Sequence, residues 1–428
     1  MPRLGRPNVR ILVEPSDYVL RNAGDMAMLH VAVTRLSSLW PAASIQVLSD
    51  TPDLLPQYAP NSRPLASTGR RGWLADTVLR GPLWDSLSAR NPDTIRRLER
   101  TLRVRWPALA RAIRKRRGLF TQDMQEFLSA VMTADLVVVT GMGGITDAFP
   151  EYAHGVLETL SLAQHYGVPT VMVGQGLGPI VDRDLWKRAA AVLPRLDFIS
   201  LREGYAGLPL LRRLHVPADR IMVTGDDAIE LAYRVRPAES GRGLGINLRA
   251  ASYSGIGVEL VRRLGELVRE CAAVHHAPLV PVPISAVPGE EDLNTIATMT
   301  GEYPDVMPSA VPTSWAAVFE QIGFCRVLVT GSYHAGVFAL AQGVPSICVA
   351  QSQYYVDKFV GLADQFGEGC RVIQLQEPGV APGFVDAVGH LWDNADVLRP
   401  SLLAKASAQI ALGHAAYGRI RALLETRR

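Results

Sequence analysis

The chain has 428 residues, of which 48% are hydrophobic and 20% are charged, and its formal net charge is +3 at pH 7. This length and this apolar fraction are enough for two domains with full cores. The small net charge argues against nucleic acid as a partner. We expect neither a signal peptide nor a membrane span, because the apolar runs are too short for either.

The first half alternates strand and helix patterns, which predicts a parallel sheet covered by helices on both faces. The predicted strands occupy residues 9–13, 44–48, 136–140, 170–173, 198–200 and 221–223. The predicted helices occupy residues 26–39, 120–133, 152–166, 184–193 and 205–214. Residues 50–90 are rich in Pro, Gly, Ser and Arg, and predict short helices with a mobile segment.

Residues 94–117 form the most basic part of the chain, with apolar residues at helical spacing and a helix break at Pro107. Such an insertion is typical either of a solvated helix face or of a surface that contacts anionic lipid or a lipid-phosphate-linked substrate. The second interpretation predicts peripheral contact of residues 96–117 with the inner face of the plasma membrane.

We place a domain boundary at residues 235–242, so that residues 1–238 and 239–428 are the two predicted domains. In the second domain, strands are predicted at residues 244–248, 279–283, 305–307, 326–330, 346–350 and 371–375. Its predicted helices occupy residues 258–275, 293–300, 313–322, 335–341, 356–366 and 387–426. The predicted fold is α/β, with two Rossmann-like domains whose parallel sheets face each other across a cleft. The last helix is expected to cross back to the first domain.

His334 lies where the strand 326–330 ends and the helix 335–341 begins, after Gly331 and Ser332. Ligands of open α/β sheets bind at this edge, so we interpret His334 as functional. A histidine that only caps the helix is the alternative.

Polar residues also follow other predicted strands, which indicates one site between the domains. They include Asn22, Asp25, Arg202, Asp226, Asp227, Asn247 and Arg249. The glycine-rich turns at 141–144 and 174–178 could cradle an anion. The chain has no GxxxxGK[ST] or GxSxG motif, which argues against a P-loop NTPase and an α/β-hydrolase. No histidine pair has metal-ligand spacing, so we predict no metal and no cofactor.

Seven motifs follow one another along the chain: NAGDMAMLHVAV, VVVTGMGGITD, VGQGLGPI, ISLREGYAG, VTGDDA, GINLR and SYHAGVFALAQGVPSI. Their order resembles that of polysaccharide pyruvyl transferases, over residues 9–366. The resemblance implies a fold similar to that of GT-B glycosyltransferases. It also implies transfer of a pyruvyl group from phosphoenolpyruvate to a sugar of a cell-surface glycan or lipid-linked saccharide, as a pyruvate ketal.

Such a reaction needs cations for the donor phosphate and carboxylate, a general acid for the enol carbon, and an acceptor for the sugar hydroxyl proton. By resemblance, His334 is the general acid or a phosphate ligand, and Arg249 holds the donor unless it forms a structural salt bridge between the domains. Asp25, Asp226 and Asp227 are candidates for the base. Further donor-side candidates are Asn247, Ser332, Tyr333, Lys358 and Arg202. The acceptor-side candidates are Asn22, Gly143, Gly144, Gln175, Tyr354 and Tyr355, the last two alternatively packing under the following helix.

Ser332 departs from the family, in which an arginine usually stands two residues before the histidine. Loss of that guanidinium removes hydrogen bonds worth about 1.5–3 kcal/mol each. Either another cation replaces it, with Lys358, Arg202 and Arg21 as candidates, or the donor differs. A GT-B-like glycosyltransferase that uses a nucleotide sugar and a non-catalytic sugar-binding relative therefore stay open.

The cysteines Cys271, Cys325, Cys348 and Cys370 lack paired spacing, and we expect them to be reduced in a cytoplasmic protein. The sequence leaves a homo-oligomer open.

Overall fold

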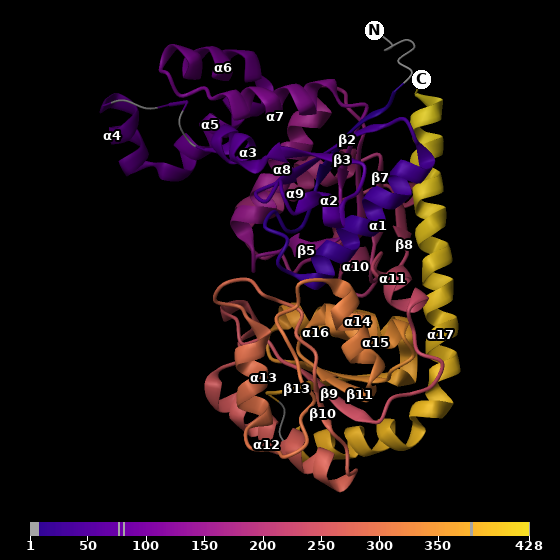
Figure 1. Cartoon of the computed structure of the whole chain (residues 1–428). Coiled ribbons are helices and arrows are strands. Elements are labelled where there is room, and N and C mark those ends of the chain that lie inside the picture. The colour runs from indigo at the N-terminus through magenta and orange to yellow at the C-terminus, as the bar shows by residue number, and fades with distance from the viewer. Residues whose placement is uncertain (1–7, 76–77, 80–81, 377–379, 428) are drawn as a thin grey trace.

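A computed structural model describes residues 8–75, 78–79, 82–376 and 380–427. Two parallel sheets lie in separate α/β layers, one above the other, and a long helix runs along both (Figure 1). The mobile segment expected within residues 50–90 overlaps 76–77 and 80–81, which lie outside the described residues.

The first sheet has eight strands, and each strand pairs in parallel with its neighbour. Seven of them follow the order β3 (Ser62–Ala66), β2 (Ser44–Ser49), β1 (Arg10–Glu14), β4 (Leu136–Val139), β6 (Thr170–Leu177), β7 (Phe198–Leu201) and β8 (Ile221–Val223). The eighth, β5 (Met142–Ile145), pairs with β6. Sequence patterns predicted β5 as a turn because it contains two glycines, and they missed β3 because Pro64 and exposed residues suit only an edge strand.

The helices of this domain pack around the sheet and extend to one side of it (Figure 1). Those next to the sheet are α1 (Ala23–Leu39), α2 (Leu55–Tyr58), α7 (Gln122–Thr133), α8 (Pro150–His165), α9 (Arg183–Val192), α10 (Gly207–Arg213) and α11 (Ile229–Arg234). The lateral extension contains α3 (Ser67–Leu74), α4 (Pro82–Arg90), α5 (Pro92–Arg105) and α6 (Pro107–Arg116).

The basic stretch forms α5 and α6, and the break falls at Pro107 as expected. Two of its arginines are internal and belong to neither a solvated nor a lipid-contacting face. Arg103 is buried and its Nε lies 2.7 Å from Oε1 of Glu158. Arg114 is also buried, and it donates hydrogen bonds to the carbonyl oxygens of Trp73 and Ala75, at 2.8 and 2.6 Å.

The second sheet is also parallel, in the order β10 (Leu279–Pro281), β9 (Gly243–Asn247), β11 (Cys325–Thr330), β12 (Ser346–Ala350) and β13 (Cys370–Gln374). The strand predicted at residues 305–307 is reduced to a single bridge between Val306 and Leu279. The helices of this domain are α12 (Val258–Val274), α13 (Asp292–Thr300), α14 (Trp315–Gly323), α15 (Tyr333–Ala341) and α16 (Gln353–Phe366).

The final helix, α17 (Val380–Thr426), contains Pro400 and packs against both domains, as the sequence predicted (Figure 1). One cluster of buried apolar side chains also runs across the domain interface, from Met28 on α1 to Phe338 on α15. Our division at residue 238 falls between α11 and β9 and stays a proposal. None of the described helices, α17 included, combines the length and the apolar character needed to cross a bilayer.

Candidate active site

A cavity of about 290 Å³ lies between the two domains, where the carboxyl ends of strands from both sheets meet. Backbone hydrogen bonds join the domains beside it, from Ala23 N to Ile284 O and from Ala286 N to Arg21 O, both at 2.9 Å. Twelve of the residues predicted for the site line the cavity: Asn22, Asp25, Gly143, Gly144, Arg202, Arg249, Ser332, Tyr333, His334, Tyr354, Tyr355 and Lys358.

His334 lies in the first turn of α15, with 12% of its side chain exposed. Its ring packs on Gly24 of α1, where any Cβ atom would overlap the ring. Burial, followed by the charges of Arg202 and Lys358, lowers the pKa of His334 well below its usual value. The imidazole is therefore neutral at neutral pH.

Arg202 and Lys358 bring two further cations to the cavity from opposite domains. Arg202 follows β7, and its guanidinium lies 4.0 Å from the centre of the Tyr333 ring. The Nζ atom of Lys358, on α16, lies 3.5 Å from the centre of the Tyr354 ring. Burial, followed by the charge of Arg202, lowers the pKa of Lys358 well below its usual value. A Cβ atom at Gly143 would overlap both cations, so this glycine permits their close approach.

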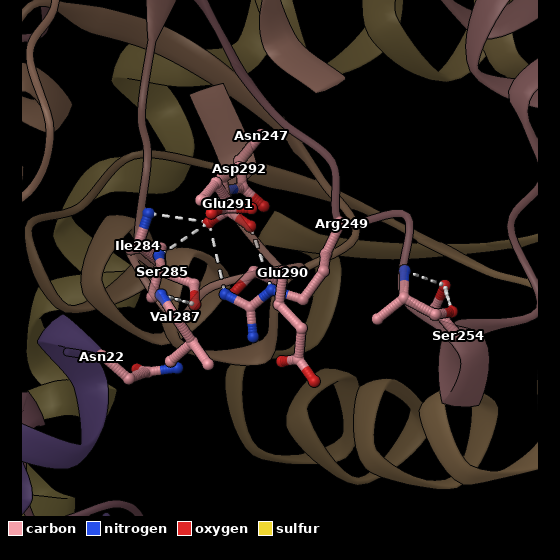
Figure 2. A network of polar contacts seen from close by, with 12 residues as sticks. Asn22, Asn247, Arg249, Ser254, Ile284, Ser285, Val287, Glu290, Glu291 and Asp292 are labelled. Atoms are coloured by element: carbon pink, nitrogen blue, oxygen red, sulfur yellow. Dashed lines mark hydrogen bonds and ion pairs between the residues drawn. The ribbon is translucent and has the colours of Figure 1, made fainter. Parts of the chain in front are cut away.

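Arg249 follows β9 and is held by Asp292, at the start of α13 (Figure 2). Its Nε lies 2.9 Å from Oδ1 of Asp292, and its Nη2 lies 3.2 Å from Oδ2. The same carboxylate accepts hydrogen bonds from the side chain of Asn247, at 3.0 Å, and from the backbone N–H groups of Ile284 and Ser285, at 2.7 and 2.9 Å. These five hydrogen bonds fix the direction in which Arg249 points.

Sequence patterns missed Asp292. An acidic residue at a helix start is usually read as a cap that complements the helix dipole. Only the fold shows that this carboxylate, fully buried, joins the ends of β9 and β10.

Asp25 lies in the first turn of α1 and accepts a hydrogen bond from the Ser16 hydroxyl at 2.8 Å. Burial, followed by the charge of Asp17, raises the pKa of Asp25 to about 7. A carboxyl group that titrates near neutral pH can both accept and return a proton. Asn22 caps the same helix, because its side chain accepts hydrogen bonds from the N–H groups of Gly24 and Asp25.

Aromatic rings form one wall of the cavity. Sequence analysis named Tyr354 and Tyr355 there, and the structure adds Phe149 and Tyr253. Tyr253 stacks on Tyr355, with ring centres 6.2 Å apart, and contacts Phe149 edge to face at 4.9 Å. Phe149 directly precedes α8, and Tyr253 lies in a single 3₁₀ turn (Ser252–Ser254); such positions carry no periodic signal, so sequence patterns did not find them.

Five predicted residues do not line the cavity. Asp227 points away from it, to Nη1 of Arg35 at 2.7 Å and to the hydroxyl of Tyr417 at 2.9 Å. Gln175 is buried in the first sheet, where its side chain donates a hydrogen bond to the Thr140 carbonyl at 2.6 Å. Asn247 is buried, and its side chain donates hydrogen bonds to Asp292 and to the Val282 carbonyl and accepts one from the Thr330 hydroxyl. Arg21, a candidate to replace the missing arginine, is exposed and also lies outside the cavity lining.

Asp226, next to Asp227, is the fifth residue outside the lining, but its carboxylate lies beside two residues that line the cavity. Its Oδ2 lies 3.7 Å from Nε2 of His334 and 3.6 Å from Nη1 of Arg202. Within the described ranges, no three His, Cys, Asp or Glu side chains are grouped so that they could hold a metal ion.

A family model described as polysaccharide pyruvyl transferase matches residues 22–353. No curated protein matches the chain significantly. Solved structures are similar over almost the whole length. A glycosyltransferase from Rickettsia africae is 11% identical with a TM-score of 0.54, and the match covers 98% of this chain and 99% of that chain.

A UDP-GlcNAc 2-epimerase from Neisseria meningitidis is also 11% identical, with a TM-score of 0.53 and coverage of 98% and 100%. A UDP-glucosyltransferase from Polygonum tinctorium is 13% identical, with a TM-score of 0.53 and coverage of 98% and 99%. At such identities the likeness concerns the fold alone, and it confirms the predicted pair of Rossmann-like domains.

Proposed function

Because this chain belongs to the polysaccharide pyruvyl transferase family, we propose that it transfers a pyruvyl group from phosphoenolpyruvate to a sugar of a cell-surface glycan or lipid-linked saccharide, as a pyruvate ketal. The observation that carries this proposal is the set of three cations around one neutral histidine, namely Arg202, Arg249 and Lys358 around His334.

The donor carries a phosphate and a carboxylate close together, and both need cationic partners. Arg249 is oriented by Asp292, while Arg202 and Lys358 lie on aromatic rings. The family usually has an arginine at the position of Ser332. In this chain, Arg202 and Lys358 supply positive charge in its place. The N-terminus of α15 adds backbone N–H groups, which favour an anion at that position.

His334 is the proposed general acid for C3 of the donor. The neighbouring cations lower its pKa, and a bound donor with about three negative charges would reverse that effect and favour a protonated ring. Protonation at C3 converts the methylene into a methyl group and makes C2 electrophilic. Two sugar hydroxyl oxygens then bond to C2, and the phosphate leaves from it.

Asp25 is the proposed base that accepts a proton from the attacking hydroxyl, because its pKa lies near 7 and it lines the same cavity. Of the two hydroxyl protons, one balances the proton given to C3 and the other leaves with the phosphate. The aromatic wall of Phe149, Tyr253 and Tyr355 provides apolar faces on which a sugar ring can pack.

A nucleotide-sugar glycosyltransferase is the second candidate, and the fold it shares with solved UDP-dependent enzymes favours it. The two reactions are separated by incubating the protein with phosphoenolpyruvate and a panel of methyl glycosides. We expect release of inorganic phosphate that depends on both substrates, and a pyruvylated glycoside detected by mass spectrometry. Glycosyl transfer from a UDP-sugar without pyruvylation would contradict the proposal.

We propose the cytoplasm as the place of action. Cys271, Cys325, Cys348 and Cys370 are all buried free thiols, which suits a reducing compartment. Peripheral membrane contact is proposed through α5 and α6, where Trp106 and Leu109 are 55% and 50% exposed among arginines.

A further inference from the structure

A second cavity, of about 980 Å³, lies on the N-terminal domain beside the candidate active site. Its walls come from α3, α5 and the N-terminal parts of α8 and α9, which are grouped on one side of the first sheet (Figure 1). Tyr152, near the start of α8, lines both cavities. We call this second cavity the basic groove.

The basic groove is strongly cationic. Its carboxylates are Glu151, Glu158, Asp182 and Asp184. Its nine lysine and arginine residues are Arg70, Arg71, Arg96, Arg97, Arg100, Arg103, Arg183, Lys187 and Arg188. This excess of positive charge is concentrated locally, because the whole chain carries a net charge of only +3. A concave surface with this charge attracts a multivalent anion.

Part of this charge maintains the fold. Arg103 pairs with Glu158 at 2.7 Å, and Arg188 pairs with Asp184 at 3.3 Å. The exposed side chains of Arg97, Arg183 and Lys187 make no ion pair with any residue that the structure describes. These three cations are free to bind a ligand.

Buried nitrogen atoms give a second, independent sign of a ligand. Nη2 of Arg70 and Nδ1 of His154 have no hydrogen-bond partner within the described ranges. Arg70 is only 5% exposed, and its Nε lies 3.1 Å from Oε2 of the buried Glu14. Buried N–H groups are nearly always satisfied in folded proteins, so unpartnered ones at the wall of a cavity indicate a missing acceptor.

We propose that the basic groove binds the phosphate groups of the acceptor, so that the substrate is a sugar linked to phosphate or diphosphate. This inference rests on the proposed function, because it treats the neighbouring cavity as the place where the sugar reacts. Arginine binds phosphate through two parallel hydrogen bonds, and the groove offers several arginines. With its sugar in the active-site cavity, the acceptor would extend past Tyr152 and place its phosphate groups in the basic groove.

Calorimetric titration of the full chain with inorganic pyrophosphate tests the basic groove directly. The test variant is R97Q/R183Q/K187Q, which removes three cations that make no ion pair with described residues. The matched control is R195Q/R212Q/R371Q, which removes three exposed arginines that lie outside the groove and outside α5 and α6. Phosphoenolpyruvate is titrated separately into each protein, so that failure of the donor site is recorded independently.

We expect saturable pyrophosphate binding that weakens by about tenfold or more in the test variant and is retained in the control, since charge-assisted hydrogen bonds are lost only in the former. Phosphoenolpyruvate affinity should be equal in all three proteins. Equal pyrophosphate affinity in the test variant and the wild type would overturn the proposal.

A second arm distinguishes acceptor phosphates from lipid headgroups. Each protein is sedimented with vesicles of phosphatidylcholine and phosphatidylglycerol. If the test variant loses vesicle binding but keeps pyrophosphate binding, these cations contact a membrane surface and the groove proposal is wrong. Loss of pyrophosphate binding with unchanged sedimentation supports it.

Discussion

Nε2 of His334 lies 3.7 Å from Oδ2 of Asp226, and neither atom has a hydrogen-bond partner in the described part of the chain. Burial raises the pKa of Asp226 to about 6, although Arg202 acts in the opposite direction. The two groups come from different domains, and a proton between them would satisfy both. In the proposed mechanism, this pair would hold a proton for His334 next to the three cations of the cavity.

Replacement of His334 by alanine should therefore lower kcat far more than it changes the affinity for the donor. Loss of a general acid costs about 10²- to 10⁴-fold in rate. Steady-state kinetics on H334A measures this, with His390→Ala, an exposed position on α17, as the matched control. A kcat in H334A within a factor of a few of the wild-type value would remove His334 from the mechanism.

Arg249 and Asp292 should act together on donor binding. If Arg249 holds the donor as proposed, R249A removes hydrogen bonds worth about 1.5–3 kcal/mol each, so KM for phosphoenolpyruvate should rise about 10- to 100-fold. D292N keeps Arg249 but loosens its orientation, so it should raise KM by a smaller factor. The double variant should add little to R249A. Independent, multiplying effects of the two substitutions would show that Asp292 does not act through Arg249.

Asp25 predicts a specific dependence of stability on pH. Its pKa is about 7 when folded and about 4 when unfolded, so between these values the folded protein binds more protons. The free energy of unfolding should therefore fall as pH rises from about 4 to about 7, and then level off. D25N lacks this term and should be more stable than the wild type at pH 8, by roughly 1–3 kcal/mol, but not at pH 4.

Urea denaturation at both pH values measures the effect. Activity should change with pH in the direction opposite to stability. Because Asp25 must be ionised to act as a base, kcat/KM should rise with pH through an apparent pKa near 7. A wild type and a D25N variant with parallel stability curves would contradict the burial of an ionisable Asp25.

Asp227 should matter for stability rather than for chemistry. It binds Arg35 and the hydroxyl of Tyr417, and so attaches α17 to the first domain. D227A leaves Arg35 buried with one carboxylate partner fewer, which should cost about 3–5 kcal/mol. Y417F removes one hydrogen bond and should cost about 1 kcal/mol. Thermal unfolding measures both, and a D227A protein that is fully stable but inactive would restore Asp227 to the site.

The sequence predicted those site residues whose place in the fold follows from their position at the end of a strand. Strand periodicity placed Arg202, Arg249 and His334 at strand ends, and the parallel topology then brought them to one cavity. Strand periodicity could not show which of the two neighbouring carboxylates, Asp226 or Asp227, faces His334. The chain turns there after Gly225, which has a φ of 87°, and this local geometry decides which carboxylate faces His334.

Contacts between residues that lie far apart in the sequence could not be predicted either. Asp292 lies 43 residues after Arg249, and no local pattern links them. For the same reason, the sequence did not show that two arginines of the basic stretch are internal. Arg103 and Arg114 look like exposed helix residues in the sequence, yet the fold buries them against Glu158 and against backbone carbonyls.

The most direct test of the central claim is calorimetric titration of the purified protein with phosphoenolpyruvate, beside a panel of nucleotide sugars. We predict saturable binding of phosphoenolpyruvate that is lost in R249A and retained in D227A under conditions where that variant is folded. Binding of a nucleotide sugar, with no binding of phosphoenolpyruvate, would contradict the account and assign the cavity to glycosyl transfer.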